Sequence, residues 1–233
     1  MPSRKAKAAE AAERSRRAFL IGVAGLGAAG AGAIGLASWL FQREPRLPTV
    51  AIVTREAWGA LPANPAGSIE GLYDPAVNPE GYLVYDRPLT VALKDLIVHH
   101  TATSFDATPV DVQRLHMQDR GYADVGYHYL IGADGTVYEG RAIEARGAHT
   151  GGRNTGAIGV SLFGNFELTE PTVAQLDSLW RLSTALCHDY WIARLGGHRD
   201  YQPGATVCPG ATLWPRLPDL AGACKVSLVR ADF

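Results

Sequence analysis

The sequence predicts an α/β fold in a single domain, with a central mixed β-sheet flanked by helices. Short apolar runs typical of strands occur along the chain together with two segments of helical character. These strands and helices follow one another without a regular repeat, which favours a mixed sheet. Beyond the N-terminal segment about 185 residues remain, enough for one domain with a sizeable core.

The N-terminal 41 residues predict an export signal or a membrane anchor. The first 17 residues contain six Lys or Arg, and the pair Arg16 and Arg17 precedes the uncharged stretch 18–41. This pattern resembles a twin-arginine signal, a substrate of the twin-arginine export machinery. The stretch is also long enough to anchor the chain, with its basic flank inside. Both interpretations place the following domain outside the cytoplasm, with membrane contact only through this segment.

The rest of the chain divides into a linker at 42–49 and a folded domain at 50–233. A formal net charge of −1 provides no basic surface for nucleic acid, which we exclude as a partner. We expect a monomer. Of the three cysteines, Cys187 and Cys224 either pair or stay free if Cys208 binds metal.

The first elements of the domain are predicted to be strands. Residues 49–53 form a short apolar strand, and a segment rich in Pro, Gly and Asn at 61–81 reads as an insertion. The apolar run at 93–100 predicts a buried strand.

A helix is predicted next. Thr108 is a capping residue, Pro109 suits the first turn, and Asp111 is an early acid. Gly121 should end this helix.

A hairpin and a further strand follow. The segments 127–131 and 136–139 flank Asp134 and Gly135, two residues that tolerate the positive φ values of a tight turn. The apolar run 157–163 predicts another strand.

A long helix is predicted to open at 169–171, where Thr, Glu and Pro occur together. Gly196 and Gly197 follow it and lead to His198. The apolar residues at helical spacing are Val173, Leu176, Leu179, Trp180, Leu182 and Leu186.

Four residues of the domain are candidate zinc ligands: His99, His100, His198 and Cys208. Two imidazoles and one thiolate would leave one position open on a tetrahedral Zn²⁺, as in hydrolytic sites. Successive residues of a strand face opposite sides of the sheet, so only one residue of the His99 and His100 pair should face the site. Periodicity does not decide which one.

Two other site types are excluded by missing residues. The triplet His-Arg-Asp at 198–200 occurs in kinase catalytic loops, but Ala205 stands where the Asn is needed and no Gly-rich phosphate loop precedes it. A zinc nucleobase deaminase needs His-x-Glu and Pro-Cys-x-x-Cys, and the chain contains neither.

Five segments resemble the peptidoglycan recognition protein and type 2 N-acetylmuramoyl-L-alanine amidase family, and this resemblance also implies the mixed-sheet fold. Their order and spacing along the chain make the resemblance specific. The segments are VTREAWGA at 53–60, LIVHHTAT at 96–103, DVGYHYLIGADGTVYEGR at 124–141, GAHTGGRNTGAIGVSLFGNF at 147–166 and GGHRDYQPGATVCPG at 196–210.

The resemblance implies a role for each candidate residue. His99, the first of the pair, would bind zinc with His198 and Cys208, while His100 would pack or hydrogen-bond on the other face. Tyr127 would be the catalytic tyrosine. Thr206 would assist it at a position where phage-type members carry Lys and many animal-type members carry Thr, donating a hydrogen bond to a developing oxyanion.

The Gly-rich segment would line the groove for the peptide stem, with contacts from His149, Arg153 and Asn154. His116 and His188 lack ligand-like spacing and are interpreted as structural or surface residues.

The resulting hypothesis is a zinc-dependent N-acetylmuramoyl-L-alanine amidase that hydrolyses the amide between the lactyl group of muramic acid and L-alanine in peptidoglycan. The alternatives are a non-catalytic peptidoglycan-binding module, whose known examples typically lack the cysteine ligand, and a zinc enzyme acting on another acyl-amino acid linkage.

Overall fold

The computed structural model describes residues 50–66 and 81–230. The predicted signal or anchor at 1–41, the linker at 42–49 and most of the predicted insertion at 61–81 lie outside the described residues. Within the described ranges, no helix combines the length and the apolar character needed to cross a membrane.

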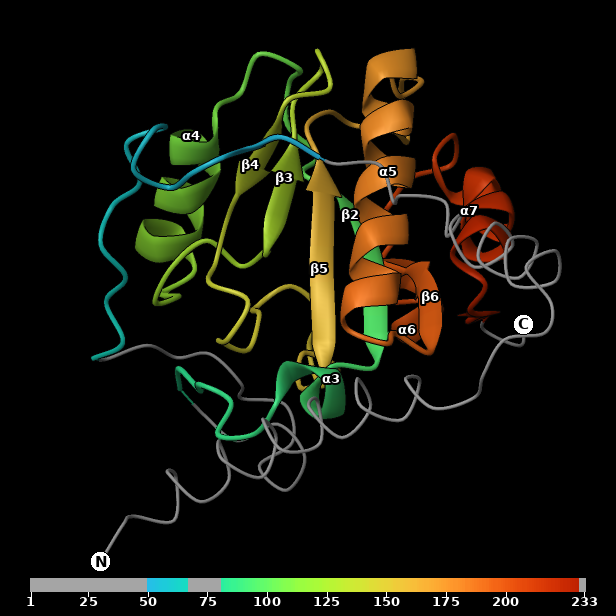
Figure 1. Cartoon of the computed structure of the whole chain (residues 1–233). Coiled ribbons are helices and arrows are strands. Elements are labelled where there is room, and N and C mark those ends of the chain that lie inside the picture. Colours follow the sequence, from blue (N-terminus) through green and yellow to red (C-terminus); the bar gives the residue numbers. More distant parts are fainter. Residues whose placement is uncertain (1–49, 67–80, 231–233) are drawn as a thin grey trace, which may run out of the picture. The chain divides into compact units, whose positions relative to one another are not determined.

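The described strands form one mixed sheet of seven strands, which confirms the predicted class (Figure 1). Its order is β1-β4-β3-β5-β2-β6-β7, and only β3 and β4 pair antiparallel. The strands are β1 (Ile52–Val53), β2 (Asp95–His100), β3 (Tyr129–Ile131), β4 (Val137–Glu139), β5 (Ala157–Leu162), β6 (Arg194–Gly197) and β7 (Ser227–Leu228).

The interior strand β2 is buried along its whole length and pairs with β5 and β6. Val98 lies opposite Gly197, the last residue of β6. The chain therefore leaves β6 beside the end of β2, which brings His198 next to His99.

The helices are α3 (Leu89–Ala92), α4 (Pro109–Arg114), α5 (Val173–Asp189), α6 (His198–Tyr201) and α7 (Leu217–Cys224), with a π-helical turn at Leu115–Asp119 and a 3₁₀ turn at Trp214–Arg216. The predicted start of α4 is confirmed: Thr108 and Asp111 form a reciprocal capping box around Pro109. Gly121, with a φ of 68°, follows the π-helical turn.

The predicted start of α5 was wrong. The cap is Thr172, whose hydroxyl accepts from the Gln175 backbone N–H while the Gln175 side chain accepts from the Thr172 N–H. Because of this capping box, the first turn of the helix begins at Val173, after the predicted start at 169–171. Val173, which was assigned to the apolar face, is 85 % exposed.

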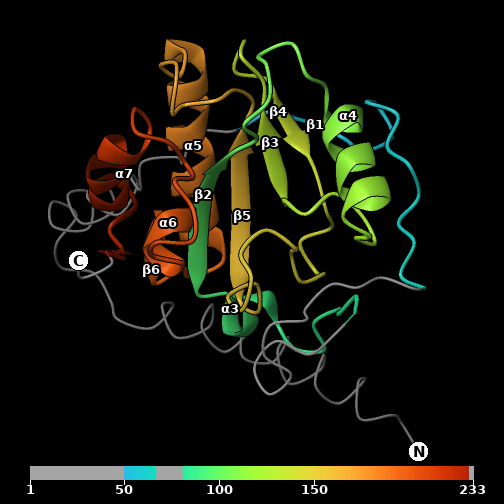
Figure 2. The same ribbon diagram turned by 180° about the vertical axis from the view of Figure 1, so that it is seen from behind.

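The two faces of the sheet carry different cores. Leu96 and Val98 pack on one face with Leu179, Leu182 and the residues of α7. Figure 1 shows α5 in front of β2, and the reverse view of Figure 2 shows β2 in front of α5. On the other face, Val112 of α4 packs with Tyr127 and its neighbours. His99 alternates with Val98 along β2 and therefore belongs to the α4 face.

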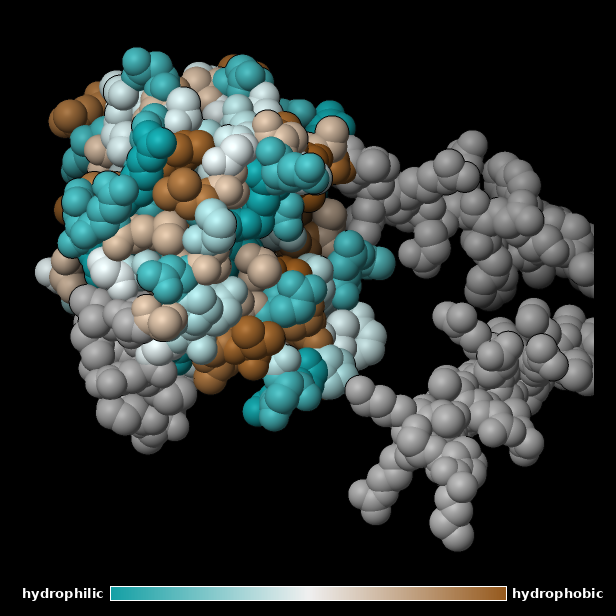
Figure 3. Space-filling view, turned by 90° about the vertical axis from the view of Figure 1, so that its left-hand side faces the viewer, coloured by the Kyte–Doolittle hydropathy of each residue, from teal (hydrophilic) through white to brown (hydrophobic). Residues whose placement is uncertain are grey.

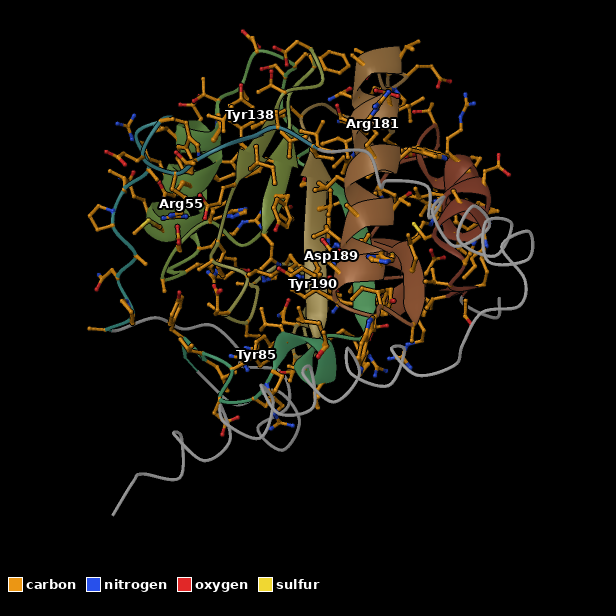
Figure 4. All side chains as sticks on the ribbon, in the orientation of Figure 1. Arg55, Tyr85, Tyr138, Arg181, Asp189 and Tyr190 are labelled. Carbon is orange, nitrogen blue, oxygen red and sulfur yellow. The ribbon has the colours of Figure 1, made fainter. Side chains whose placement is uncertain are left out.

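The segment after β1 forms polar contacts with residues on both sides of Tyr127 in the sequence. Arg55 forms an ion pair of 3.0 Å with Asp124, and its guanidinium donates to the Gly140 carbonyl at 2.5 Å. Trp58 donates its indole N–H to the Glu139 carbonyl at 2.8 Å. Figure 4 shows Arg55 beside α4, and the surface of this side is drawn in Figure 3, where apolar residues form separate patches among polar ones. The VTREAWGA motif thus anchors the strand and loop that precede the candidate site.

Candidate metal centre

Three candidate ligands converge beside the end of β2. His99 is the penultimate residue of β2, His198 begins α6, and Cys208 lies in the loop that follows α6. One nitrogen of each histidine and the Cys208 Sγ all lie within 4.8 Å of one another. Two imidazoles and a thiolate at this spacing fit a zinc ion with an open position.

His99 is fully buried and has a partner on each side of its ring. Its Nδ1 lies 3.6 Å from Cys208 Sγ, and its Nε2 lies 3.0 Å from His149 Nδ1. Burial, followed by the neighbouring His198 and His149, holds the pKa of His99 well below its usual range. Burial also lowers the pKa of His198. Both rings are therefore neutral at pH 7, which is the form that binds metals.

His100 points to the opposite face, as expected for the second histidine of the pair. Its Nδ1 accepts a hydrogen bond from the Phe166 backbone N–H at 3.1 Å. Its own backbone N–H donates to Cys208 Sγ at 3.4 Å, so the strand supports the thiol without using the imidazole.

Cys208 is buried, with 7 % of its surface exposed. Burial raises the pKa of its thiol to about 12, so a thiolate at this position requires a neighbouring cation. The Cys208–Pro209 peptide bond is cis. A Cβ on Gly197 would lie 2.5 Å from Pro209 Cδ. The close approach of β6 to the cysteine segment therefore requires glycine at this position.

Gly197→Ala is expected to weaken zinc binding and lower Tm, because the added methyl displaces the Cys208 and Pro209 segment; overpacking of this kind costs about 1–3 kcal/mol. Zinc affinity by chelator competition and thermal unfolding are the measurements. Gly222→Ala is the matched control, since outside its own helical turn no atom of the described residues lies within 4 Å of its added Cβ. Unchanged zinc affinity in the Gly197 variant would contradict the role assigned to this contact.

Tyr127 lies against the ligand cluster. Its ring centroid is 5.1 Å from that of His99, and 8 % of the residue is exposed. Behind it, His116 packs at 5.3 Å and accepts from the Gly126 backbone N–H at 2.8 Å, which confirms a structural role for His116. Burial raises the pKa of Tyr127 above its usual value, so the phenol is neutral and can donate a hydrogen bond at pH 7.

Thr206 is half-buried on the loop that carries Cys208. Its hydroxyl oxygen accepts from the Cys208 backbone N–H at 3.1 Å. The hydroxyl therefore orients the loop, while its own proton is available to a second acceptor.

The three predicted groove residues occupy different environments. His149 is 9 % exposed and contacts His99. Asn154 is buried, and its side-chain oxygen accepts from the backbone N–H groups of His149 and Thr150 at 2.9 and 2.8 Å. Arg153 is exposed and borders a hollow of about 650 Å³ that Asp95 and Tyr201 also line. The structure thus brings His149 to the ligands and places Arg153 at a separate hollow; their contact with substrate stays a prediction.

Two supporting residues were missed in the sequence. Gln202 binds His198, with 2.7 Å between Gln202 Oε1 and His198 Nε2. His128 is buried behind His149, accepts from the Gly159 backbone N–H at 2.9 Å and contacts the Ala145 carbonyl at 3.0 Å. In the sequence, only the position of His128 next to Tyr127 pointed to a role for His128. No sequence feature pointed to a role for Gln202.

Acid is expected to destabilise the fold through His128. Burial lowers its pKa to about 4, with Arg141 adding to the shift, whereas an unfolded histidine titrates near ~6.5. The unfolded chain therefore binds more protons between about pH 6.5 and 4, and up to about 3 kcal/mol of stability is lost as the pH falls through this window. The measurement is Tm against pH with chelator present, so that metal release does not contribute.

His128→Gln should flatten part of this dependence, while His116, whose pKa burial lowers to about 3, and the buried His99 and His198, whose pKa values are also lowered, maintain the remainder. An identical slope in the variant and the wild type would refute the assignment to His128.

Comparison with known proteins places the chain in a family. The family model for N-acetylmuramoyl-L-alanine amidase matches residues 90–211, just over half of the chain. The chain belongs to the peptidoglycan recognition protein and type 2 amidase family. Peptidoglycan-recognition protein SC2 of Drosophila simulans is 34 % identical over 175 residues, covering 71 % of this chain and 83 % of the relative.

Solved structures of this family share the fold. The crystal structure of Drosophila peptidoglycan recognition protein SD is 30 % identical, with a TM-score of 0.57 over 72 % of this chain and 94 % of the other. The N-acetylmuramoyl-L-alanine amidase LysCS from Clostridium intestinale is 32 % identical, with a TM-score of 0.54 over 62 % and 93 %. The family thus includes both proteins named for recognition and proteins named for catalysis.

Proposed function

We propose that this protein is a zinc-dependent N-acetylmuramoyl-L-alanine amidase that cleaves the bond between the lactyl group of muramic acid and L-alanine in peptidoglycan. The observation that carries the proposal is the convergence of His99, His198 and Cys208, with Tyr127 against them. A site for recognition alone would need neither the buried thiol nor the two neutral imidazoles.

His99, His198 and Cys208 would hold the zinc ion. When bound, zinc polarises the scissile carbonyl and makes water nucleophilic near neutral pH. Tyr127 keeps its proton at pH 7 and can therefore donate to the oxygen that gains charge in the tetrahedral transition state. Thr206 offers a second, weaker donor on the same loop as Cys208.

The burial of the ligands supports this chemistry. His99 has no exposed surface, and Cys208 has little, so the reacting groups lie in a region of low dielectric constant. Hydrogen bonds to a developing charge are stronger in such surroundings than in water.

Digestion of purified cell wall by the zinc-loaded protein tests the proposal. Mass spectrometry of the products should show stem peptides with a free N-terminal L-alanine and glycan strands without peptide. Zinc-loaded protein that binds the wall but releases no such peptide would refute the amidase assignment and favour the binding module. Cleavage of only other acyl-amino acid substrates would establish the third hypothesis.

A further inference from the structure

We propose that Gln202 is a positioning residue for the metal centre, which presents Nδ1 of His198 to the ion and ties this ligand to the Gly-rich loop at 147–154. The inference rests on the proposed function in one respect, the presence of a metal between the three ligands. It adds a residue that affects metal affinity but belongs neither to the three ligands nor to the predicted groove residues.

The hydrogen bonds of Gln202 fix the orientation of its side-chain amide. Its Nε2 lies 2.8 Å from the Gly151 carbonyl oxygen, which can only accept. The amide nitrogen therefore faces Gly151, and the amide oxygen faces His198 Nε2 at 2.7 Å. This oxygen also only accepts, so His198 carries its proton on Nε2.

The position of this proton decides which atom of His198 can bind metal. A neutral imidazole has one N–H and one lone pair, and the lone pair is then on Nδ1. Histidine ligands of metals are commonly oriented by a partner on the second ring nitrogen, and loss of that partner typically costs about 10–100-fold in metal affinity. Gln202 meets this description.

The same loop supports the other histidine. His99 Nε2 lies 3.0 Å from His149 Nδ1, and the Thr150 hydroxyl lies 2.9 Å from His149 Nδ1 and 3.4 Å from His99 Nε2. Cys208 Sγ is on the Nδ1 side of His99. His99 therefore turns Nδ1 toward the thiol, and the Nε2 atoms of both histidines contact residues 149–151, directly for His99 and through Gln202 for His198.

The local fold makes Gln202 suited to this role. It follows α6 as the cap residue, and its backbone N–H donates to the His198 carbonyl at 3.1 Å. Residues four apart on a helical turn face the same side, which places both side chains together. Gln202 is half-buried, so its truncation removes the two hydrogen bonds without leaving a large cavity in the core.

Three variants separate positioning from folding. Gln202→Ala should weaken Zn²⁺ binding by about 10–100-fold in chelator competition. Gln202→Glu should recover most of the affinity, since a carboxylate still accepts from His198 Nε2–H although it cannot donate to Gly151. Gln118→Ala, at an exposed position, is the control and should bind zinc as the wild type does.

The second readout needs no metal. Long-range ¹H–¹⁵N NMR of the chelator-treated wild type should show His198 as the Nε2–H tautomer, and Gln202→Ala should lose this preference while its circular dichroism is unchanged. Wild-type affinity in Gln202→Ala, or an Nδ1–H tautomer in the wild type, would overturn the inference. Wild-type protein without zinc affinity would refute the proposed function instead, and the tautomer measurement would still decide the role of Gln202.

Discussion

Cys208→Ala is expected to abolish stoichiometric zinc binding and to lower amidase activity by more than ~100-fold. Two histidines alone remain in that variant, and the site loses the one side chain of the three that would bind zinc as an anion. Elemental analysis of the purified protein and the rate of stem-peptide release from cell wall are the two measurements. Both should fall together, because the proposed chemistry depends on a bound zinc ion.

Cys224→Ala is the control for this substitution. Cys224 is partly exposed at the end of α7 and packs against the α5 face of the sheet, away from the ligands. It should keep full zinc content and activity. A Cys208→Ala protein that retained both would show that the metal centre is assigned to the wrong residues.

Tyr127→Phe is expected to lower kcat by about 10²–10³-fold, the usual contribution of one oxyanion donor. The ring that packs against His99 and His116 is retained, so zinc content and binding to cell wall should stay close to the wild type. An effect on kcat with little change in KM marks an interaction made in the transition state. Steady-state kinetics on a soluble muropeptide separates the two parameters.

Tyr129→Phe provides a matched loss of a tyrosine hydroxyl at a half-buried position. Tyr129 lies two residues further along the chain but packs on the α5 face, and burial raises its pKa as it does for Tyr127. Its replacement should leave kcat unchanged. Equal losses in both variants, or none in Tyr127→Phe, would remove Tyr127 from the catalytic mechanism.

The elements with strong local patterns were predictable from the sequence. The apolar run of β2, the Asp-Gly turn between β3 and β4 and the Thr108 cap each specify their structure through neighbours in the chain. β6 was missed because its sequence, Arg-Leu-Gly-Gly, has little strand propensity and becomes a strand through pairing with β2. α6 is only four residues long, too short for periodicity to detect.

In the candidate site, too, some residues could be predicted from the sequence and others only from the folded structure. His99, His198 and Cys208 could be proposed because their side chains have few uses other than metal binding in such a pattern, and the structure brings them together. Gln202 and Thr150 support the ligands through hydrogen bonds between segments about 50 residues apart in the chain. An amide or hydroxyl in a loop has many possible partners, so only the folded arrangement identifies the one it uses.

The contacts of Arg55 indicate that the structural unit around the candidate site begins before the region matched by the family model. The family model starts at residue 90, yet the cation that faces the buried carboxylate of Asp124 comes from the segment just after β1. A fragment trimmed to the family boundary would leave that carboxylate without its Arg55 partner, and removing one partner of a buried ion pair costs about 3–5 kcal/mol. This loss of stability would affect the segment at Asp124, three residues before Tyr127. A protease that cut the chain between Arg55 and α3 and released the N-terminal piece is therefore expected to lower the proposed activity although His99, His198 and Cys208 remain in the chain.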